Sequence, residues 1–329
     1  MESKNNWKAW LYLAPTLILM VVFTFYPIFN SFIIAFLKNY TMDANGAESV
    51  IHSIFKEDGG LTLKNFTEIL GITKIGERPN GDGTFTPIKY KMIYQVALPN
   101  TLLLTVITVP CSVILALLIS VGLNAIPVFK KFFQTVFFLP YVTNSIAVGM
   151  VFAVIFSSRN GLWNTIFGLG DLKWIDQGVQ GFRPMFALCL FIIWNSLPYK
   201  ILIFLSGLQG IDKQYYQAAK IDSASKFKTF MRVTVPLLSP QILYITITSL
   251  IGSFKEYSAV VGLFNGPGTT PNGVGEKGQN MLTMVYFIVE NLRNLDSIEY
   301  SAAGAVVLFA IIMVFTVIQN QVSKKRVHY

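Results

Sequence analysis

Polar and charged side chains interrupt two long apolar segments of the 329-residue sequence. The first segment contains Asn195, Ser196, Tyr199 and Lys200, and the second contains Ser249, Ser253, Lys255 and Glu256. A charge in the hydrocarbon core of a membrane costs at least about 2.5 kcal/mol on insertion scales, so such groups are expected to face protein or water. Hydroxyls, an amide and aromatic rings together suit a polyhydroxylated ligand. The alternative is a structural ion pair of Lys255 with Glu256, or side chains that snorkel to the membrane interface.

The composition indicates a membrane protein. Hydrophobic residues make up 53% of the chain and charged residues only 13%, whereas a soluble domain has roughly 25% charged residues. The net charge of +9 does not favour a nucleic-acid partner, because the basic residues are scattered through loops and form no single basic face. Membrane topology explains this charge better.

Six apolar stretches are long enough to cross a membrane, which requires about 20 helical residues. They predict an all-α integral membrane protein with a single transmembrane domain over residues 1–329. Several spans contain or adjoin prolines, which favour kinks, although proline is common in membrane helices generally. The segment Met281–Val289 is too short to span and is predicted to be an interfacial or loop helix. The predicted spans are Trp10–Leu37, Leu98–Leu123, Phe133–Phe156, Met185–Leu208, Pro240–Phe264 and Ser301–Asn320.

Charge asymmetry predicts the orientation. Twelve basic and three acidic residues lie in segments 1–9, 124–132, 209–239 and 321–329, whereas the remaining loops together hold 12 basic and 13 acidic residues. By the positive-inside rule, the first set is cytoplasmic. Both termini and the loop 209–239 are therefore expected in the cytoplasm, and the loop 38–97 outside it.

The loop between the fourth and fifth predicted spans contains a distinctive motif. Its sequence predicts two short amphipathic helices: Asp212 caps the first, the turn Asp222-Ser223 separates them, and Pro236 ends the second. The adjacent alanines Ala218 and Ala219 allow another surface to approach closely.

This loop resembles the Glu-Ala-Ala loop of binding-protein-dependent ABC permeases, in particular their sugar branch of maltose-type and glycerol-3-phosphate-type permeases. The resemblance extends over nearly the whole chain, in order and on the predicted sides. The matching loop positions are Gln217, Ala218, Ala219, Asp222, Ser223, Ala224, Phe227, Pro236 and Pro240. The other matches are Leu13-Ala-Pro15, Phe25-Tyr-Pro27, Asn100-Thr101, Phe138-Leu-Pro-Tyr141, Gly161-Leu-Trp-Asn164 and Asn265-Gly-Pro267.

Two loop positions depart from the family pattern. Gln217 replaces the usual Glu, so a charge-assisted contact to an ATPase would become a neutral hydrogen bond of roughly half the strength. Ser223 replaces the usual Gly; if the turn requires a positive φ, the strain is on the order of 1 kcal/mol.

The resemblance implies a type I ABC importer permease in the bacterial cell membrane, importing sugars, most simply di- or oligosaccharides. It implies pairing with a second homologous permease, coupling to two ATPase subunits that use ATP and Mg, and an extracytoplasmic solute-binding protein. Residues 209–239 would form the ATPase-coupling loop through Gln217, Ala218, Ala219, Asp222 and Ser223. The substrate-lining segments would contain Asn195, Ser196, Tyr199 and Thr248–Glu256.

The sequence also leaves other functions open. A stand-alone secondary transporter or channel is the main alternative, and glycerol-3-phosphate-like or acidic sugars are alternative substrates because of Lys200 and Lys255. An enzyme has little support, since there is no phosphate-binding glycine loop and no catalytic or metal-binding cluster of His, Cys or carboxylates. No cofactor is expected in this chain, and ATP hydrolysis would come from another one.

Overall fold

The computed structural model describes residues 6–40, 42–43, 46–47, 50–55, 59–73, 76–79, 85–88, 93–126, 132, 135–136, 141–176, 179, 181–264, 281–293 and 298–324. The chain divides into two compact units. One consists of residues 1–93 and 287–309, and the other of residues 94–286 and 310–329.

The first unit begins with a long apolar helix. Helices α1 (Asn6–Met20) and α2 (Tyr26–Ala35) are joined by a π-helical turn, η1 (Val21–Phe25), and together provide the span Trp10–Ala35. Pro27 has no backbone N–H to donate to the preceding turn, and a π-helical turn is a common way for a helix to accommodate this loss.

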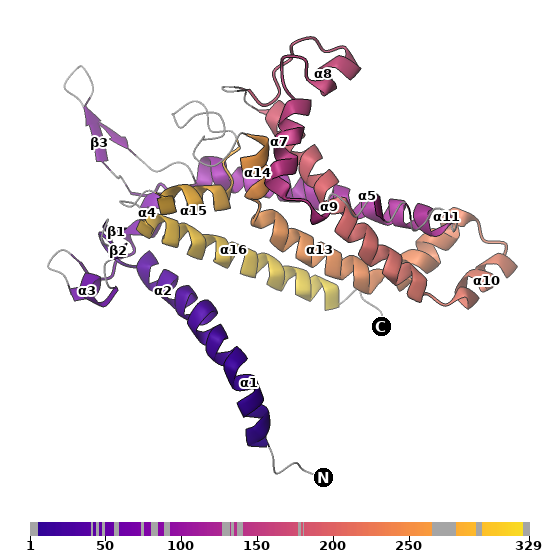
Figure 1. The fold of residues 1–329 in the computed structure, drawn as a ribbon, viewed down its shortest axis with the longest axis horizontal. Helices are drawn as coiled ribbons and strands as arrows, with labels where there is room; N and C mark the ends of the chain where they lie inside the picture. Colours follow the sequence, from indigo (N-terminus) through magenta and orange to yellow (C-terminus); the bar gives the residue numbers. More distant parts are fainter. Residues whose placement is uncertain are drawn as a thin grey trace. The chain divides into compact units, whose positions relative to one another are not determined.

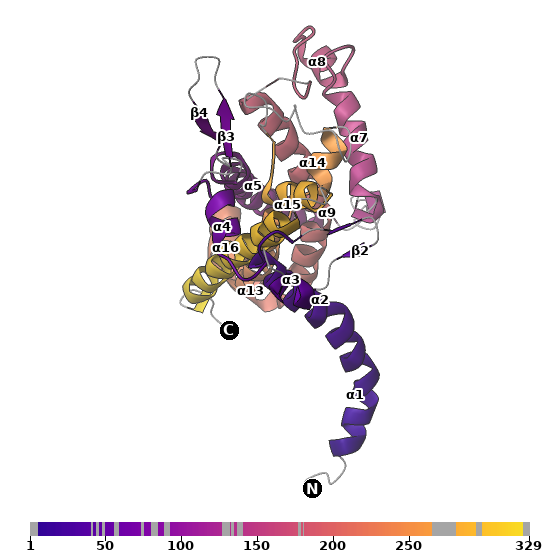
Figure 2. The same ribbon diagram turned by 90° about the vertical axis from the view of Figure 1, so that its left-hand side faces the viewer.

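The segment after α2 contains two antiparallel hairpins and two short helices. The hairpins are β1 (Met42–Asp43) with β2 (Gly46–Ala47), and β3 (Gly76–Pro79) with β4 (Phe85–Ile88), the second of which is seen in Figure 2. The helices are α3 (Val50–Phe55) and α4 (Lys64–Ile69).

Helix α4 is fastened to the end of α2. The buried Asn65 amide donates hydrogen bonds to the carbonyl oxygens of Ala35 (3.0 Å) and Leu37 (2.7 Å). These bonds satisfy carbonyl groups that the end of a helix leaves without partners. Glu68 of α4 accepts a 2.7 Å hydrogen bond from the Tyr300 hydroxyl.

Three long helices form the core of the second unit: α5 (Leu98–Asn124), which follows the π-helical turn η2 (Ile93–Ala97), α9 (Phe182–Gly210) and α13 (Ser239–Phe254) (Figure 1). Helix α5 packs against both of the others. Their shared core is built from aliphatic side chains and one phenylalanine. This core contains Val109, Val113, Ala116, Leu123, Ile201, Phe204, Leu205 and Ile245.

A second contact in this unit joins α7 (Ser145–Ile155) to α14 (Ser258–Leu263). Asn144 caps α7, accepting a 2.9 Å hydrogen bond from the Ile146 amide. The backbones meet at two glycines: a Cβ added to Gly149 would lie 2.7 Å from the Cα of Gly262. Small residues allow helices to approach closely in this way. Beyond α7 the chain forms the short helix α8 (Leu162–Phe167).

The remaining helices lie in the loop between α9 and α13 and in the segment after α14. The loop between α9 and α13 folds into α10 (Lys213–Ile221), α11 (Lys226–Thr229), the π-helical η3 (Phe230–Thr234) and α12 (Val235–Leu237). Helices α15 (Met284–Arg293) and α16 (Ile298–Lys324) complete the chain, and α15 confirms the helix predicted around Met281–Val289.

The predicted spans can be compared with these helices. Four helices are long and apolar enough to cross a membrane, and they match the first, second, fourth and sixth predictions: Trp10–Ala35, Gln95–Asn124, Phe182–Gly210 and Ile298–Gln321. A fifth candidate is the pair Lys226–Leu237 and Ser239–Phe254, bent by 68°. Of the third prediction, α7 is the helix that the structure describes, and part of that span lies outside the described residues.

The fifth span was predicted to be continuous from Pro240 to Phe264, and this was wrong. Helix α13 ends at Phe254 and α14 begins at Ser258. The break coincides with the adjacent charged residues Lys255 and Glu256. The helix that follows the break has backbone N–H groups without partners in its first turn, and Glu256 accepts a hydrogen bond from one of them, the Ala259 amide.

Candidate functional site

A cavity of about 350 Å³ lies within the second unit. It is bounded by α5, α9, α13 and the residues around the start of α7. Most of its lining side chains are polar. They are Thr108, Val109, Ser112, Tyr141, Thr143, Ser145, Ile192, Asn195, Ser196, Tyr199, Lys200, Thr248, Ser249, Gly252, Ser253 and Glu256.

Helix α5 contributes one polar face to this region. Thr101, Thr105, Thr108 and Ser112 are all buried and follow one another at spacings of four, three and four residues. Thr105 and Thr108 contact the Ser253 hydroxyl on α13 at oxygen–oxygen distances of 3.0 and 3.5 Å. The hydroxyls therefore link α5 to α13 along the cavity wall.

Lys200 lies at the junction of α5 and α9, with only 5% of its surface exposed. Its ammonium donates hydrogen bonds to the hydroxyls of Ser112 on α5 and of Ser196 on α9, the latter at 3.2 Å. Within the described part of the chain, no carboxylate oxygen lies within 4.0 Å of the ammonium. The buried charge is therefore held by neutral oxygens.

Glu256 and Lys255 occupy different environments although they are adjacent. Glu256 lines the cavity, and its Oε1 accepts a 2.9 Å hydrogen bond from the Ala259 amide in the first turn of α14. Lys255, which was predicted to line the same site as Glu256, is exposed and is not among the residues that line this cavity. Nor do the described residues show the alternative ion pair between the two side chains.

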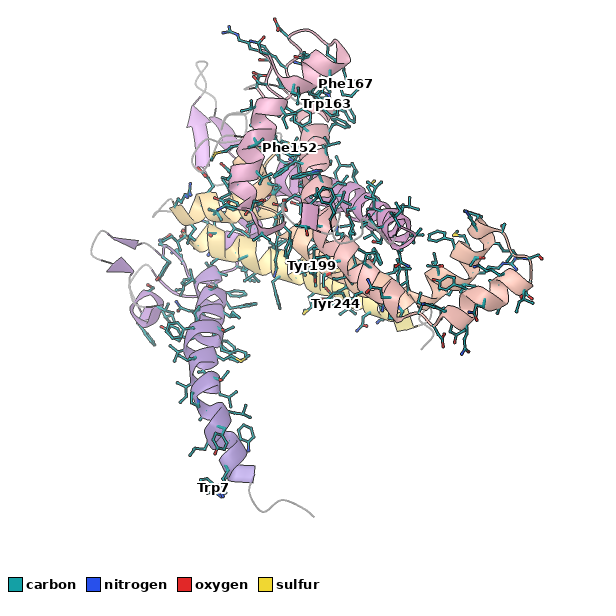
Figure 3. The ribbon with its side chains drawn as sticks, turned by 45° about the vertical axis from the view of Figure 1, so that its right-hand side comes forward. Trp7, Phe152, Trp163, Phe167, Tyr199 and Tyr244 are labelled. Atoms are coloured by element: carbon teal, nitrogen blue, oxygen red, sulfur yellow. The ribbon has the colours of Figure 1, made fainter. Side chains whose placement is uncertain are left out.

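Tyrosines gather beside the cavity. The rings of Tyr141 and Tyr199 stack with a centroid distance of 5.7 Å and an interplanar angle of 15°. The hydroxyls of Tyr199 on α9 and Tyr244 on α13 lie 3.0 Å apart, and both side chains are labelled in Figure 3. Asn195 donates a 3.2 Å hydrogen bond to the hydroxyl of Ser145. The cavity thus combines hydroxyls, an amide, aromatic rings and two charged groups.

The structure brings together seven of the eight residues predicted to line a site, all except Lys255. Sequence reasoning missed the contribution of α5 and of the segment before α7, represented by Thr108, Ser112 and Tyr141. The helical spacing of the α5 hydroxyls would have revealed the first group. Among the described residues, no group of three or more His, Cys, Asp or Glu side chains could hold a metal ion.

The loop between α9 and α13 folds largely as its sequence predicts. Asp212 caps α10, its Oδ1 accepting a 2.9 Å hydrogen bond from the Gln214 amide. The turn Asp222-Ser223 separates α10 from α11, as predicted. The second helical stretch continues through η3 and α12 to Leu237, one residue beyond the predicted end at Pro236.

Ser223 has a positive φ of 51°, the condition under which its replacement of glycine was expected to cause strain. The Ser223 amide donates to the Lys220 carbonyl (3.0 Å) and the Ala224 amide to the Ala219 carbonyl (2.9 Å). These two hydrogen bonds define a Schellman motif, in which glycine usually occupies the position of Ser223.

The two alanines of the motif differ in exposure. Gln217 and Ala218 are exposed, whereas Ala219 is buried against this chain itself, with 9% of its surface exposed. The hydroxyls of Tyr216 on α10 and Thr234 on η3 lie 3.3 Å apart and connect the two helical stretches of the loop. The surface that the loop offers to a partner therefore includes Gln217 and Ala218, but not Ala219.

Comparison with known proteins places this arrangement among transport permeases. The lactose transport system permease protein LacF of Rhizobium radiobacter is 27% identical over 97% of this chain and 95% of its own length. The arabinooligosaccharides transport system permease protein AraP of Bacillus subtilis is 29% identical over 95% of this chain and 88% of its own.

Solved structures show the same fold. One chain of a bacterial ABC transporter involved in the import of the acidic polysaccharide alginate superimposes with a TM-score of 0.73, at 17% identity, over 98% of this chain and 96% of that one. Residues 109–328 match the family described as binding-protein-dependent transport system inner membrane component. That match covers more than half of the sequence, so the chain belongs to this family of multi-pass membrane permeases, as its sequence predicted.

Proposed function

We propose that this chain is the transmembrane subunit of an ATP-driven importer of sugars, with di- or oligosaccharides as substrates. The observation that carries the proposal is the polar cavity enclosed by α5, α9 and α13, in a chain that belongs to a permease family. The relatives named for lactose and for arabinooligosaccharides support a saccharide substrate.

The cavity provides groups suited to sugars. Serine and threonine hydroxyls both donate and accept hydrogen bonds, as sugar hydroxyls do. Tyr199 and Tyr141 add aromatic surface beside them. The substrate-lining residues in this proposal are Asn195, Ser196, Tyr199, Lys200, Ser249, Ser253 and Glu256, together with Thr108, Ser112 and Tyr141.

The proposed partners are a second homologous permease, two ATPase subunits that bind ATP and Mg, and an extracytoplasmic solute-binding protein. A related alginate importer has been solved with an alginate pentasaccharide-bound periplasmic protein, which supports the last of these. The loop 209–239 contacts an ATPase subunit through the exposed Gln217 and Ala218, while Asp222 and Ser223 shape the turn that follows α10.

In this proposal, both termini and the loop 209–239 lie in the cytoplasm of a bacterial cell. A cysteine introduced at Lys226 should be protected from an impermeant thiol reagent applied outside intact cells and should react after the membrane is opened. The matched outer position, Gly83, lies outside the described residues. Labelling of the Lys226 cysteine in intact cells would show that the loop 209–239 lies outside the cell, and the proposed orientation would then be wrong.

Uptake assays test the role of the cavity. Tyr199→Ala removes an aromatic wall of the cavity and should strongly reduce sugar uptake in cells that carry the whole importer, with the subunits still co-purifying. Tyr12→Ala is the matched control, because Tyr12 on α1 is 81% exposed and does not line the cavity. Normal uptake by the Tyr199 variant would assign this residue a structural role only.

Co-purification tests the role of the loop. Ala218→Trp overpacks an exposed contact and should weaken ATPase association by about 1 to 3 kcal/mol, while the chain remains in the membrane. Ala218→Ser keeps the side chain small and is the control. An unchanged ATPase yield and normal uptake in the tryptophan variant would contradict the assignment. Sugar transport by the purified chain alone would instead support a stand-alone transporter.

A further inference from the structure

Lys200 is a buried cation whose charge the cavity leaves without a counter-charge. A buried ammonium is normally paired with a carboxylate, because desolvation of an unpaired charge is costly. Here its partners are the hydroxyls of Ser112 and Ser196. An ammonium has three N–H donors, and among the described residues no third acceptor lies within hydrogen-bonding distance.

The other charged groups near the cavity do not neutralise Lys200. Glu256 lines the same cavity, but its Oε1 is already bonded to the Ala259 amide, and no ion pair joins it to Lys200. Lys255 is exposed and does not line the cavity. The cavity therefore contains one carboxylate that has a backbone donor and one ammonium that has only neutral acceptors.

We infer that the substrate carries an acidic group, a carboxylate or a phosphate on a sugar or polyol, and that Lys200 binds this group. The inference rests on the proposed function of the cavity. The two serines hold the ammonium at the cavity wall, and the acid of the substrate supplies both the missing counter-charge and the third hydrogen-bond acceptor. Neutral sugars would leave the charge unpaired, so Lys200 would also discriminate against them.

Matched probes test this inference. The full chain, co-purified with its partner subunits in lipid nanodiscs, is assayed by equilibrium binding of radiolabelled digalacturonate, galactobiose, glycerol 3-phosphate and glycerol. The acidic member of at least one pair should bind ten- to a hundredfold more tightly than its neutral counterpart. The pair that shows the preference distinguishes a carboxylate from a phosphate.

Two substitutions separate charge recognition from structure. Lys200→Met removes the charge at similar length and should lower the ratio of acidic-probe affinity to neutral-probe affinity ten- to a hundredfold. Lys200→Arg keeps the charge and should retain the acidic preference. If the methionine variant does not assemble, the preferences of the wild type and the arginine variant decide the question.

Tighter binding of a neutral probe by the wild type would overturn the inference. So would an equal loss of both members of a pair in Lys200→Met, because that result assigns Lys200 to holding α5 against α9. If acidic and neutral probes bind equally well to the wild type, the inference fails while the sugar-binding function stands. If none of the four probes binds, both proposals fail.

Discussion

Replacing Ser223 with glycine should stabilise the loop between α9 and α13. Ser223 occupies the C′ position of a Schellman motif with a φ of 51°. In this left-handed conformation a residue with a Cβ meets steric strain of roughly 1 to 2 kcal/mol, which glycine avoids. Ser223 is exposed, and the described contacts include no hydrogen bond from its hydroxyl, so the substitution removes little else.

The net stabilisation by Ser223→Gly is smaller than the strain energy that glycine relieves. Glycine gives the unfolded chain more conformational freedom, which costs about 0.4 to 1 kcal/mol. The expected stabilisation is therefore about 0.5 to 1 kcal/mol, enough to slow amide exchange about two- to fivefold wherever exchange proceeds by opening of α10. Hydrogen exchange of the Ser223 and Ala224 amides, measured on the full chain in nanodiscs, detects this change.

Two further substitutions at the same position test the cause. Ser223→Ala retains a Cβ and should exchange at nearly the serine rate, whereas Ser223→Val adds β-branching and should exchange faster. The reasoning fails if alanine protects as well as glycine, because relief of left-handed strain would then not be the source. It also fails if glycine speeds exchange.

Two other predictions concern packing and hydrogen bonding. Gly149→Ala should lower the thermal stability of the purified protein by about 1 to 3 kcal/mol, because the added Cβ meets the Gly262 backbone at 2.7 Å. Gly122→Ala, with no atom within 4 Å of the added Cβ, should be neutral or stabilising by up to about 1 kcal/mol, and equal effects of the two would contradict this account. Asn65→Ala removes both hydrogen bonds from α4 to the end of α2 and should lower the free energy of unfolding by about 2 to 4 kcal/mol. Limited proteolysis between residues 36 and 64 should accelerate accordingly, and an unchanged cleavage rate would exclude a fastening role.

Local features of this fold could be predicted from the sequence because local chemistry determines them. Apolar runs of about 20 residues specify spanning helices whatever their neighbours are, which is why four predicted spans match helices of the structure. The Asp212 cap is similarly local, since it depends on residues two positions apart.

Non-local contacts could not be predicted in this way. The Gly149–Gly262 contact joins segments more than a hundred residues apart, and nothing near either glycine identifies its partner. The burial of Ala219 beside the exposed Ala218 likewise depends on how α10 packs. The stripe from Thr101 to Ser112 is different, because its helical spacing is present in the sequence and is sufficient to predict a polar helix face.

The bend between α12 and α13 provides a route by which movement of the loop 209–239 would change the cavity. Helix α12 ends at Leu237 and α13 starts at Ser239, with a 68° bend between the two helical stretches. Helix α13 carries Ser249 and Ser253 into the cavity wall, so a rotation of the loop about this bend would displace that wall directly. The opposite wall is formed by α5 and α9, which pack closely against each other. On the proposed function, ATPase movement would therefore change the cavity by moving α13 against a fixed α5–α9 pair, a rigid-body motion of the kind that packed helices undergo.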